Sequence, residues 1–253
     1  MKRVDMKSLR DFSNLPIKTI IQDRHTNDID HALVYSQELL EEVNDNPNQF
    51  LVHYWPLEKT VILGLLDQQL PNLEKGISFI KEQGYQVAVR NIGGLAVVAD
   101  SGILNFSICL PINQNNFRIS DGYELMVELI RKTLAPFGKT IEAYQIDNSY
   151  CPGKFDLSID GQKFAGIAQR RKKDALLVSI YLSVNGNQNQ RGRLISDFYQ
   201  EAGAQSSSIS YPIVEPEVMA NLSQLLESDL RIEKVITMIE KSFSDLGFMK
   251  VRE

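Results

Sequence analysis

The stretch RNIGGLAVVADSGILNFS, residues 90–107, determines how the middle of the chain folds. Its two adjacent glycines, Gly93 and Gly94, indicate a tight turn, because glycine adopts positive φ without steric cost. The runs 86–91, 95–99 and 103–110 are rich in apolar and β-branched residues, which predicts three strands. We therefore expect a β-rich core around this turn and the following Asp100-Ser101-Gly102 turn.

Apolar periodicity and turn residues predict the elements on either side of this core. Helices are expected at residues 26–44 (capped by Thr26, Asn27 or Asp28), 73–83, 121–134, 193–202, 215–227 and 232–246. Strands are expected at 50–55 and 60–65 as an antiparallel pair, at 140–146, at 175–184, and at 155–159 and 162–169 as a hairpin through Asp160-Gly161. The fold class is α+β, with mixed β-sheets flanked by helices. We expect one domain over residues 1–253, with a helical C-terminal extension at about 190–253.

The composition is that of an ordinary globular protein, with 43% hydrophobic and 23% charged residues among 253. These values exclude a disordered, collagen-like or disulfide-stapled chain. The net charge of -5 gives no sign of a nucleic-acid partner, since such proteins are usually basic. No run of about 18 apolar residues occurs, so we expect no membrane partner. Two cysteines, and a start without an apolar signal-peptide core, predict a cytoplasmic protein.

Motifs for cofactors and metals are missing from the sequence. It contains neither GxGxxG after a strand nor GxxxxGK[ST], the two common phosphate-binding loops. The histidines, His25, His31 and His53, show no ligand spacing with cysteine or with each other. We therefore expect no metal and no resident cofactor.

The two cysteines differ in their sequence surroundings. Cys109 falls within the expected strand 103–110, where it is most simply a small packed residue. Cys151 precedes Pro152-Gly153 in an expected loop, which can present a side chain to a substrate. A structural role and a thiolate nucleophile both remain open for Cys151 at this point. The nucleophile needs nearby positive charge, which Lys163, across the hairpin, could supply.

The basic residue at position 90 and the basic run at 170–173 each have two interpretations. Arg90 is either a strand end at the surface or a polar group at the mouth of a pocket with a glycine wall. Residues 170–173 read RRKK and form either a solvated hairpin turn or a docking patch for an acidic protein.

Taken together, two motifs resemble those of a known family. Residues 90–107 resemble the RRxSGGGAVxHDxGNLNxS signature of the lipoate–protein ligases and lipoyl/octanoyl transferases, a superfamily that shares its fold with biotin protein ligase. Residues 156–170, DLSIDGQKFAGIAQR, resemble the family's DixxxgkKisGsaQrr segment. Residues 61–64 resemble its early strand. The resemblance covers about residues 30–185, and the two motifs occur in the expected order.

The departures from the signature point to one branch. Leu95 replaces the third glycine, Ala99 the usual histidine and Val89 the first arginine. With Cys151 ahead of the hairpin, these features are similar to the octanoyl-[glycine cleavage H protein]:protein N-octanoyltransferases. That branch carries its acyl-accepting cysteine in this loop.

The resemblance implies an acyltransferase that forms a thioester on Cys151. The donor is then the glycine cleavage H protein, and the acceptor is a lipoyl-domain lysine of a 2-oxoacid dehydrogenase E2 subunit. Lys163 is expected to hold the acyl carbonyl and to stabilise the oxyanion. The expected acyl-binding residues are Arg90, Gly93, Gly94, Leu95, Ala96, Val97, Asn105, Gly166, Ile167 and Ala168. The expected docking residues are Arg170, Arg171, Lys172 and Lys173.

Two other functions remain open on the sequence. An ATP-dependent lipoate–protein ligase would use Lys163 on an acyl-adenylate, and Cys151 would be incidental. A non-enzymatic acyl-binding module would keep the fold alone, although the presence of both Cys151 and Lys163 argues against it.

Overall fold

A computed structural model describes residues 7–22 and 29–251. Its strands are β1 (Pro16–Ile21), β2 (Phe50–Tyr54), β3 (Thr60–Leu63), β4 (Gln86–Val89), β5 (Val97–Ala99), β6 (Ile103–Pro111), β7 (Glu142–Ala143), β8 (Leu157–Ile159), β9 (Gln162–Arg171), β10 (Ala175–Ser183) and β11 (Met249–Lys250). Its α-helices are α1 (Ile29–Asp45), α2 (Leu73–Glu82), α3 (Ile119–Leu134), α4 (Gln188–Glu201), α5 (Leu222–Leu225) and α6 (Ile232–Asp245). Short 3-10 turns are η1 (Leu9–Phe12), η2 (Asp67–Gln69), η3 (Gln114–Asn116), η4 (Ala135–Phe137), η5 (Ala204–Ser206) and η6 (Pro216–Val218).

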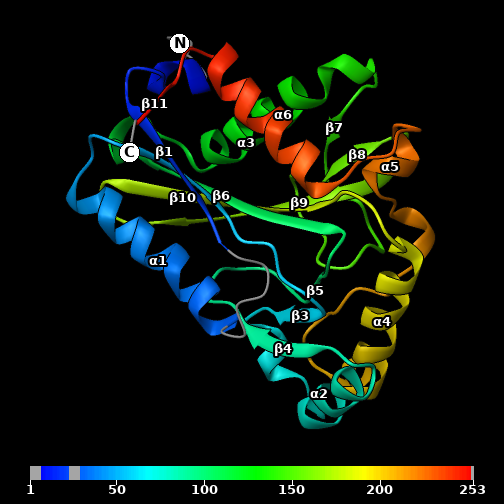
Figure 1. The fold of residues 1–253 in the computed structure, drawn as a ribbon. Helices are drawn as coiled ribbons and strands as arrows, with labels where there is room; N and C mark the ends of the chain where they lie inside the picture. Colours follow the sequence, from blue (N-terminus) through cyan, green and yellow to red (C-terminus); the bar gives the residue numbers. More distant parts are fainter. Residues whose placement is uncertain (1–6, 23–28, 252–253) are drawn as a thin grey trace, which may run out of the picture.

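The strands form two sheets, which confirms the expected α+β class with mixed sheets. The larger sheet has the order β11-β1-β2-β6-β10-β9-β8-β7, and the smaller has the order β4-β3-β5. In Figure 1, α3 and α6 cover one face of the larger sheet, while α1 and the smaller sheet lie against the other. Helices α2 and α4 lie next to the smaller sheet (Figure 1).

Alternation along β6 divides the core between these two faces. Phe106, Ile108 and Leu110 point into the cluster beneath α3 and α6, whereas Cys109 points into a separate cluster beneath α1. Successive side chains of a strand point to opposite faces, so one strand supplies both clusters. The same alternation turns Asn105 towards the side that carries the smaller sheet.

The hairpin between β8 and β9 forms as the sequence predicts. Asp160 and Gly161 have φ of 52° and 80°, and both central residues of a type I′ turn require positive φ. The helix expected at 73–83 also ends as predicted, before Gly84 with φ of 78°.

The predicted pairing of residues 50–55 with 60–65 is wrong. β2 pairs with β1 and β6 in the larger sheet, whereas β3 pairs with β4 and β5 in the smaller one. Every residue of β2 is buried, as expected for a strand covered on both faces. The segment between β2 and β3 therefore crosses between sheets and makes no hairpin turn.

Two further expectations are corrected. Residues 215–227 do not form one helix: η6 and α5 are separated by an extended segment, because the backbone of Met219 bridges to Lys163 of β9. The strand expected at 140–146 is reduced to β7, whose two residues pair with β8. The sequence also gave no prediction of β1 or β11. The cap candidates Thr26, Asn27 and Asp28 lie outside the described residues.

Candidate active site

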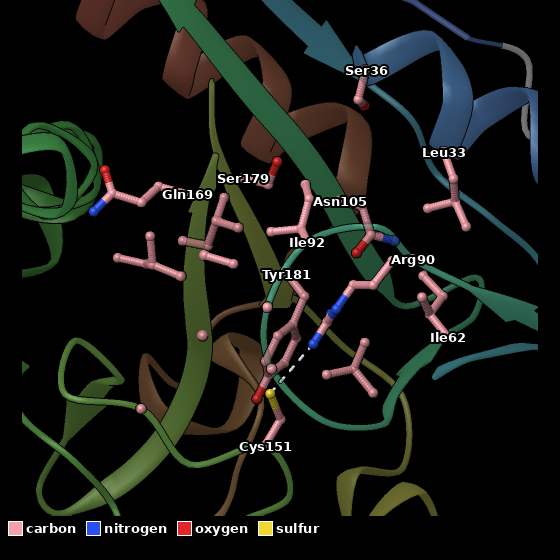
Figure 2. A pocket seen from close by; sticks show the side chains of 18 of the residues that line it. Leu33, Ser36, Ile62, Arg90, Ile92, Asn105, Cys151, Gln169, Ser179 and Tyr181 are labelled. Atoms are coloured by element: carbon pink, nitrogen blue, oxygen red, sulfur yellow. Dashed lines mark hydrogen bonds between the residues drawn. The ribbon is translucent and has the colours of Figure 1, made fainter. Parts of the chain in front are cut away.

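A cavity of about 280 Å³ lies between the larger sheet, the smaller sheet and α1. Most of its wall is apolar, including Leu33 of α1, Trp55 after β2, Ile62 of β3 and Val97 of β5. The loop 90–94 and the loop 151–153 form two more sides, and β9 and β10 form the floor. Figure 2 shows Cys151 at one end of this cavity, with Arg90 and Tyr181 beside it. Such a shape suits a ligand with an apolar body and one reacting end.

The sulfur of Cys151 accepts hydrogen bonds from two donors. The backbone N–H of Leu95 lies 3.1 Å from Sγ, and Nη2 of Arg90 lies 3.4 Å from it (Figure 2). One donor is a cation and both are directed at the sulfur, an arrangement that stabilises negative charge there. Cys151 also has a φ of 48°, an uncommon value for a residue with a Cβ atom.

Two glycines allow the 90–95 loop to reach this sulfur. A Cβ atom on Gly94 would lie 2.5 Å from Nη2 of Arg90 and 3.0 Å from Sγ of Cys151. A Cβ atom on Gly64 would lie 1.9 Å from the Gly94 carbonyl oxygen. The backbone of Gly64, directly after β3, is therefore in contact with the backbone of the 90–95 loop. Arg90 closes the loop by donating from Nη2 to the Leu95 carbonyl at 2.7 Å.

A buried carboxylate supports the same loop from beneath. Asp67 accepts from the Gly64 N–H at 2.7 Å and from the Tyr199 hydroxyl at 3.0 Å. The Tyr199 oxygen in turn accepts from the Ala96 N–H at 3.3 Å. Burial raises the pKa of Asp67 to about 6, although these hydrogen bonds oppose the shift.

Lys163 lies under the Cys151 loop. Its Nζ donates to the carbonyl oxygens of Tyr150 and Cys151 at 3.0 and 2.9 Å, and to Ser149 Oγ at 3.1 Å. It also pairs with Asp156 at 3.0 Å, and its side chain is 0% exposed. Burial raises the pKa of Asp156, and Lys163 is the main opposing influence. The predicted contact of Lys163 with an acyl carbonyl stays a prediction, because Nζ here binds the loop and lies outside the cavity wall.

Most of the predicted acyl-binding residues do line the cavity. These are Arg90, Gly93, Gly94, Val97, Asn105, Gly166, Ile167 and Ala168. Leu95 instead offers its N–H to Cys151, and Ala96 is wholly buried and outside the wall. The N–H of Ala96 points towards Tyr199, and a contact of Ala96 with the acyl group stays a prediction.

Several cavity residues were missed by the sequence reasoning. They include Trp55, Tyr123, Ser179 and Tyr181. The sequence does contain one indication of two of them. Ser179 and Tyr181 alternate with apolar residues in β10, which indicates that one face of this strand is not part of the hydrophobic core. Asp67 and Tyr199 gave no comparable signal, because their contact joins segments far apart in the sequence.

Cys109 has the packed role that the sequence favours. It is 1% exposed and its Sγ donates to the Leu39 carbonyl at 3.5 Å. Burial raises the pKa of its thiol, which keeps the sulfur protonated.

The basic residues 170–173 do not form one free patch. Arg170 and Arg171 belong to β9 and point to opposite faces: Arg170 donates to the Asn91 carbonyl, and Arg171 to the carbonyls of Phe117 and Arg118. Lys172 pairs with Glu41, while the side chain of Lys173 is 85% exposed and lies 3.8 Å from Asp174. Of these four residues only Lys173 is exposed, and the other three are half-buried.

Within residues 7–22 and 29–251, no cluster of His, Cys, Asp and Glu side chains could hold a metal ion. In the same residues, no helix has the length and apolar character needed to cross a membrane.

Comparison with solved structures supports the fold. The chain is similar to a bi-partite lipoate protein ligase from Thermoplasma acidophilum, with a TM-score of 0.70 and 19% identity over 94% of this chain and 86% of that one. It is also similar to a lipoate-protein ligase A bound with ATP, with a TM-score of 0.68 and 18% identity over 95% and 87%. At these identities the likeness concerns the fold alone.

Comparison of sequences is more specific. A lipoyl-[GcvH]:protein N-lipoyltransferase of Listeria monocytogenes is 46% identical over 76% of this chain and 69% of the relative. An octanoyl-[GcvH]:protein N-octanoyltransferase of Geobacillus kaustophilus is 43% identical over 87% and 78%. The family model described as the lipoyl protein ligase A/B catalytic domain matches residues 28–244. The chain therefore belongs to the lipoyl protein ligase A/B catalytic-domain family.

Proposed function

We propose that this chain is an octanoyl-[GcvH]:protein N-octanoyltransferase with Cys151 as its nucleophile. It takes an octanoyl or lipoyl group from a lysine of the glycine cleavage H protein and passes it to a lysine of an E2 lipoyl domain. The observation that carries this proposal is the sulfur of Cys151 at the end of an apolar cavity, held between Arg90 and the Leu95 N–H. Relatives named as an octanoyl-[GcvH]:protein N-octanoyltransferase and as a lipoyl-[GcvH]:protein N-lipoyltransferase support it.

In the first half-reaction the Cys151 thiolate attacks the carbonyl carbon of the donor's lysine amide. A sulfur–carbon bond forms, and the carbonyl becomes an oxyanion. The carbon–nitrogen bond then breaks, and the lysine nitrogen takes one proton from water and leaves as an amine. The product is an octanoyl thioester on Cys151, whose acyl chain lies in the apolar cavity.

In the second half-reaction the neutral amine of the acceptor lysine attacks the thioester carbonyl. The carbon–sulfur bond breaks, the new amide loses one proton, and Cys151 returns as a thiolate. One lysine amide has replaced another, so the net reaction needs no ATP and no resident cofactor. A ligase that starts from a free acid must instead activate the carboxylate.

We assign Lys163 as a positioning residue in the state described here. Four oxygen atoms surround its Nζ, and two of them are carbonyls of the Cys151 loop. This anchoring supports the positive φ of Cys151 and directs its sulfur at the donors. A direct contact with the acyl carbonyl would require Nζ to exchange at least one of these partners. We also propose a single catalytic domain that works in the cytoplasm.

The test is transfer between purified proteins without ATP. The enzyme is incubated with octanoylated H protein and an unmodified lipoyl domain, and each protein is followed by intact mass. We expect loss of one octanoyl group from the donor, a thioester on Cys151 and a gain on the acceptor. A dependence on ATP and free acid would indicate a lipoate–protein ligase. Binding of the acyl donor without transfer would indicate a non-enzymatic module.

A further inference from the structure

The oxyanion formed during acyl transfer needs a hydrogen-bond donor at the reacting end of the cavity. Lys163 Nζ is already surrounded by four oxygen atoms and lies outside the cavity wall. The Leu95 N–H and Arg90 Nη2 are directed at the sulfur of Cys151. These groups hold the loop and the sulfur, so the oxyanion requires a donor from another side chain beside Cys151.

The side chain of Tyr181, in β10, reaches this end of the cavity. Figure 2 shows it pointing from the sheet towards Cys151, with its hydroxyl oxygen beside the sulfur. Both residues line the cavity, and Tyr181 is 7% exposed. An acyl carbon bonded to Sγ carries its oxygen two bonds away from the sulfur. A hydroxyl beside the sulfur can therefore reach that oxygen.

Two neighbours restrict the ring of Tyr181. Gly166 is its register partner in β9, and a Cβ atom on that glycine would lie 2.7 Å from the ring. A side chain at position 166 would therefore displace the ring. Lys163 Nζ also lies 5.8 Å from the centroid of the ring, within the range of a cation–π contact. These contacts limit the directions in which the Tyr181 hydroxyl can point.

A chain of buried polar groups holds the Tyr181 hydroxyl. It interacts with the hydroxyl of Tyr150, and the centroids of the two rings lie 5.7 Å apart. The Tyr150 hydroxyl accepts from Gln188 Nε2 at 3.0 Å. Gln188 Oε1 in turn accepts from Ser183 Oγ at 2.8 Å and from Arg191 Nη1 at 3.2 Å. Because these groups are already in place, the hydroxyl needs little reorganisation when charge develops beside it.

The Tyr181 hydroxyl also keeps its proton. Burial raises the pKa of Tyr181 well above its ordinary value, and the charges of Tyr150, Asp156 and Cys151 add to this shift. At neutral pH the group is therefore uncharged. It can donate a hydrogen bond, and it is a poor acid.

We propose that Tyr181 is a catalytic residue whose hydroxyl donates a hydrogen bond to the oxyanion on the acyl carbon at Cys151. The proposal rests on the proposed function, since this oxyanion exists only during transfer through Cys151. When the sulfur–carbon bond forms, one electron pair of the carbonyl moves to its oxygen, and the Tyr181 O–H bonds to that oxygen. When the carbon–nitrogen bond breaks, the double bond forms again. Tyr181 gains and loses no proton in this step.

Two reactions of the same sulfur test this role. Acylation of Cys151 by the octanoyl thioester of N-acetylcysteamine passes through an oxyanion, whereas alkylation by iodoacetamide is a direct displacement without one. Tyr181→Phe keeps the ring and removes only the hydroxyl. We expect it to slow single-turnover acylation on the order of 10²-fold, the scale for one lost oxyanion donor, and to leave the alkylation rate unchanged. Intact mass follows both reactions.

A spectroscopic measurement reports the hydrogen bond itself. With an isotope label at the octanoyl carbonyl, the infrared stretch of acyl-Cys151 can be assigned. We expect this stretch at higher frequency in Tyr181→Phe, because a carbonyl that accepts one hydrogen bond fewer has a stiffer double bond. Tyr54→Phe is the matched control. It removes a buried hydroxyl that donates to Glu240 at 2.8 Å in the cluster beneath α3 and α6, and it should keep both rates and the native frequency.

A second variant covers the case in which Tyr181→Phe melts below the assay temperature. Tyr150→Phe leaves Tyr181 in place and removes the hydroxyl that holds it. The ratio of the acylation rate to the alkylation rate should then fall as well. A native ratio in folded Tyr150→Phe would count against the proposal.

Three results with the other proteins would overturn the proposal. If Tyr181→Phe slows acylation and alkylation equally, its hydroxyl acts on the thiolate and not on the oxyanion. If it slows neither, the oxyanion has another donor. Transfer through Cys151 stands in both cases. If the thioester does not acylate Cys151 in the native enzyme, the proposed function fails, and the role of Tyr181 with it.

Discussion

The hydrogen bonds around the two cysteines run in opposite directions. Cys109 Sγ, in the middle of β6, donates to the Leu39 carbonyl, which suits a protonated thiol. Cys151 Sγ, in the loop after β7, accepts from Arg90 and from the Leu95 N–H, which suits a thiolate. The difference lies in what surrounds each sulfur: the 90–95 loop brings hydrogen-bond donors to Cys151, whereas helix α1 brings a carbonyl oxygen to Cys109.

Removing each sulfur in turn tests the difference between the two cysteines most directly. Cys151→Ser and Cys151→Ala should lower transfer below detection, because serine is far less nucleophilic and alanine has no nucleophile. Cys109→Ala should keep most activity, since its thiol is buried outside the cavity. Transfer of octanoyl between carrier proteins measures both. Near-native turnover of Cys151→Ser would disprove the thioester mechanism.

Variants of Lys163 test whether anchoring of the Cys151 loop accounts for the difference between the two cysteines. Lys163→Ala should slow acylation by on the order of 10²-fold or more, because the Cys151 loop loses its anchor and a displacement of about 1 Å at a reacting group can cost that much. It also leaves the buried Asp156 carboxylate without its cation, which should cost about 3–5 kcal/mol of unfolding free energy. Lys163→Arg should rescue little, because a guanidinium does not fit the space of an ammonium. Acylation rates and urea unfolding measure these effects.

A double variant separates the two consequences of that change. Lys163→Met with Asp156→Asn removes the unpaired charge and should recover much of the stability but little of the rate. Recovery of both would mean that Lys163 serves stability alone. An unimpaired Lys163→Ala enzyme would remove this residue from the site.

Gly64→Ala tests the donor supplied by the Leu95 backbone. The new Cβ atom meets the Gly94 carbonyl oxygen at 1.9 Å, so one of the two backbones must move. We expect the Leu95 N–H to leave Sγ, and both acylation and alkylation by iodoacetamide to slow about tenfold. Alkylation of Cys109 in the folded protein should stay undetectable. A native alkylation rate at Cys151 would show that Arg90 alone suffices.

Asp67 gives a smaller, pH-dependent effect on the same loop. Its pKa of about 6 lies above the ordinary value of 3.8, so the fold favours the protonated carboxyl. The resulting stability is fully present below about pH 4 and is lost as pH rises through 6, by up to about 3 kcal/mol. Asparagine does not titrate, so the melting temperature of Asp67→Asn should rise relative to that of the native enzyme between pH 5 and pH 7. Parallel melting curves would contradict the shifted pKa.

The smallest expected effect concerns docking. We propose that Lys173, the exposed member of the basic stretch, attracts acidic lipoyl domains. Lys173→Glu should slow transfer a few-fold at low salt and flatten its salt dependence, while acylation by a small thioester stays unchanged. Lys81→Glu, on α2, is the matched control. Equal losses with both donors would indicate damage to the pocket.

Local signals allowed much of the fold and part of the site to be predicted. The Asp160-Gly161 hairpin, the helix stop at Gly84 and the strand 103–110 depend on nearby residues, so the sequence alone indicates them. The family motif at residues 90–107 contains Arg90 and Gly94, and both residues lie beside Cys151 in the structure.

Contacts between distant segments could not be predicted in the same way. The pairing of β2 with β6, and of β3 with β4, depends on how the chain crosses between sheets. The side chain of Lys163 points at the Cys151 loop and not into the cavity. This direction depends on Asp156 and on three oxygens of that loop, which surround the Lys163 Nζ. A motif identifies such a residue without giving the direction of its side chain.

The position of β11 has a consequence for folding during synthesis. β1 lies near the start of the described chain, yet its outer neighbour β11 comes from the end, with Pro16 paired to Met249. Until Met249 and Lys250 have left the ribosome, β1 therefore exposes an unpaired edge, a site for wrong strand pairing. Such a distant contact closes late, because the loop entropy must be overcome first.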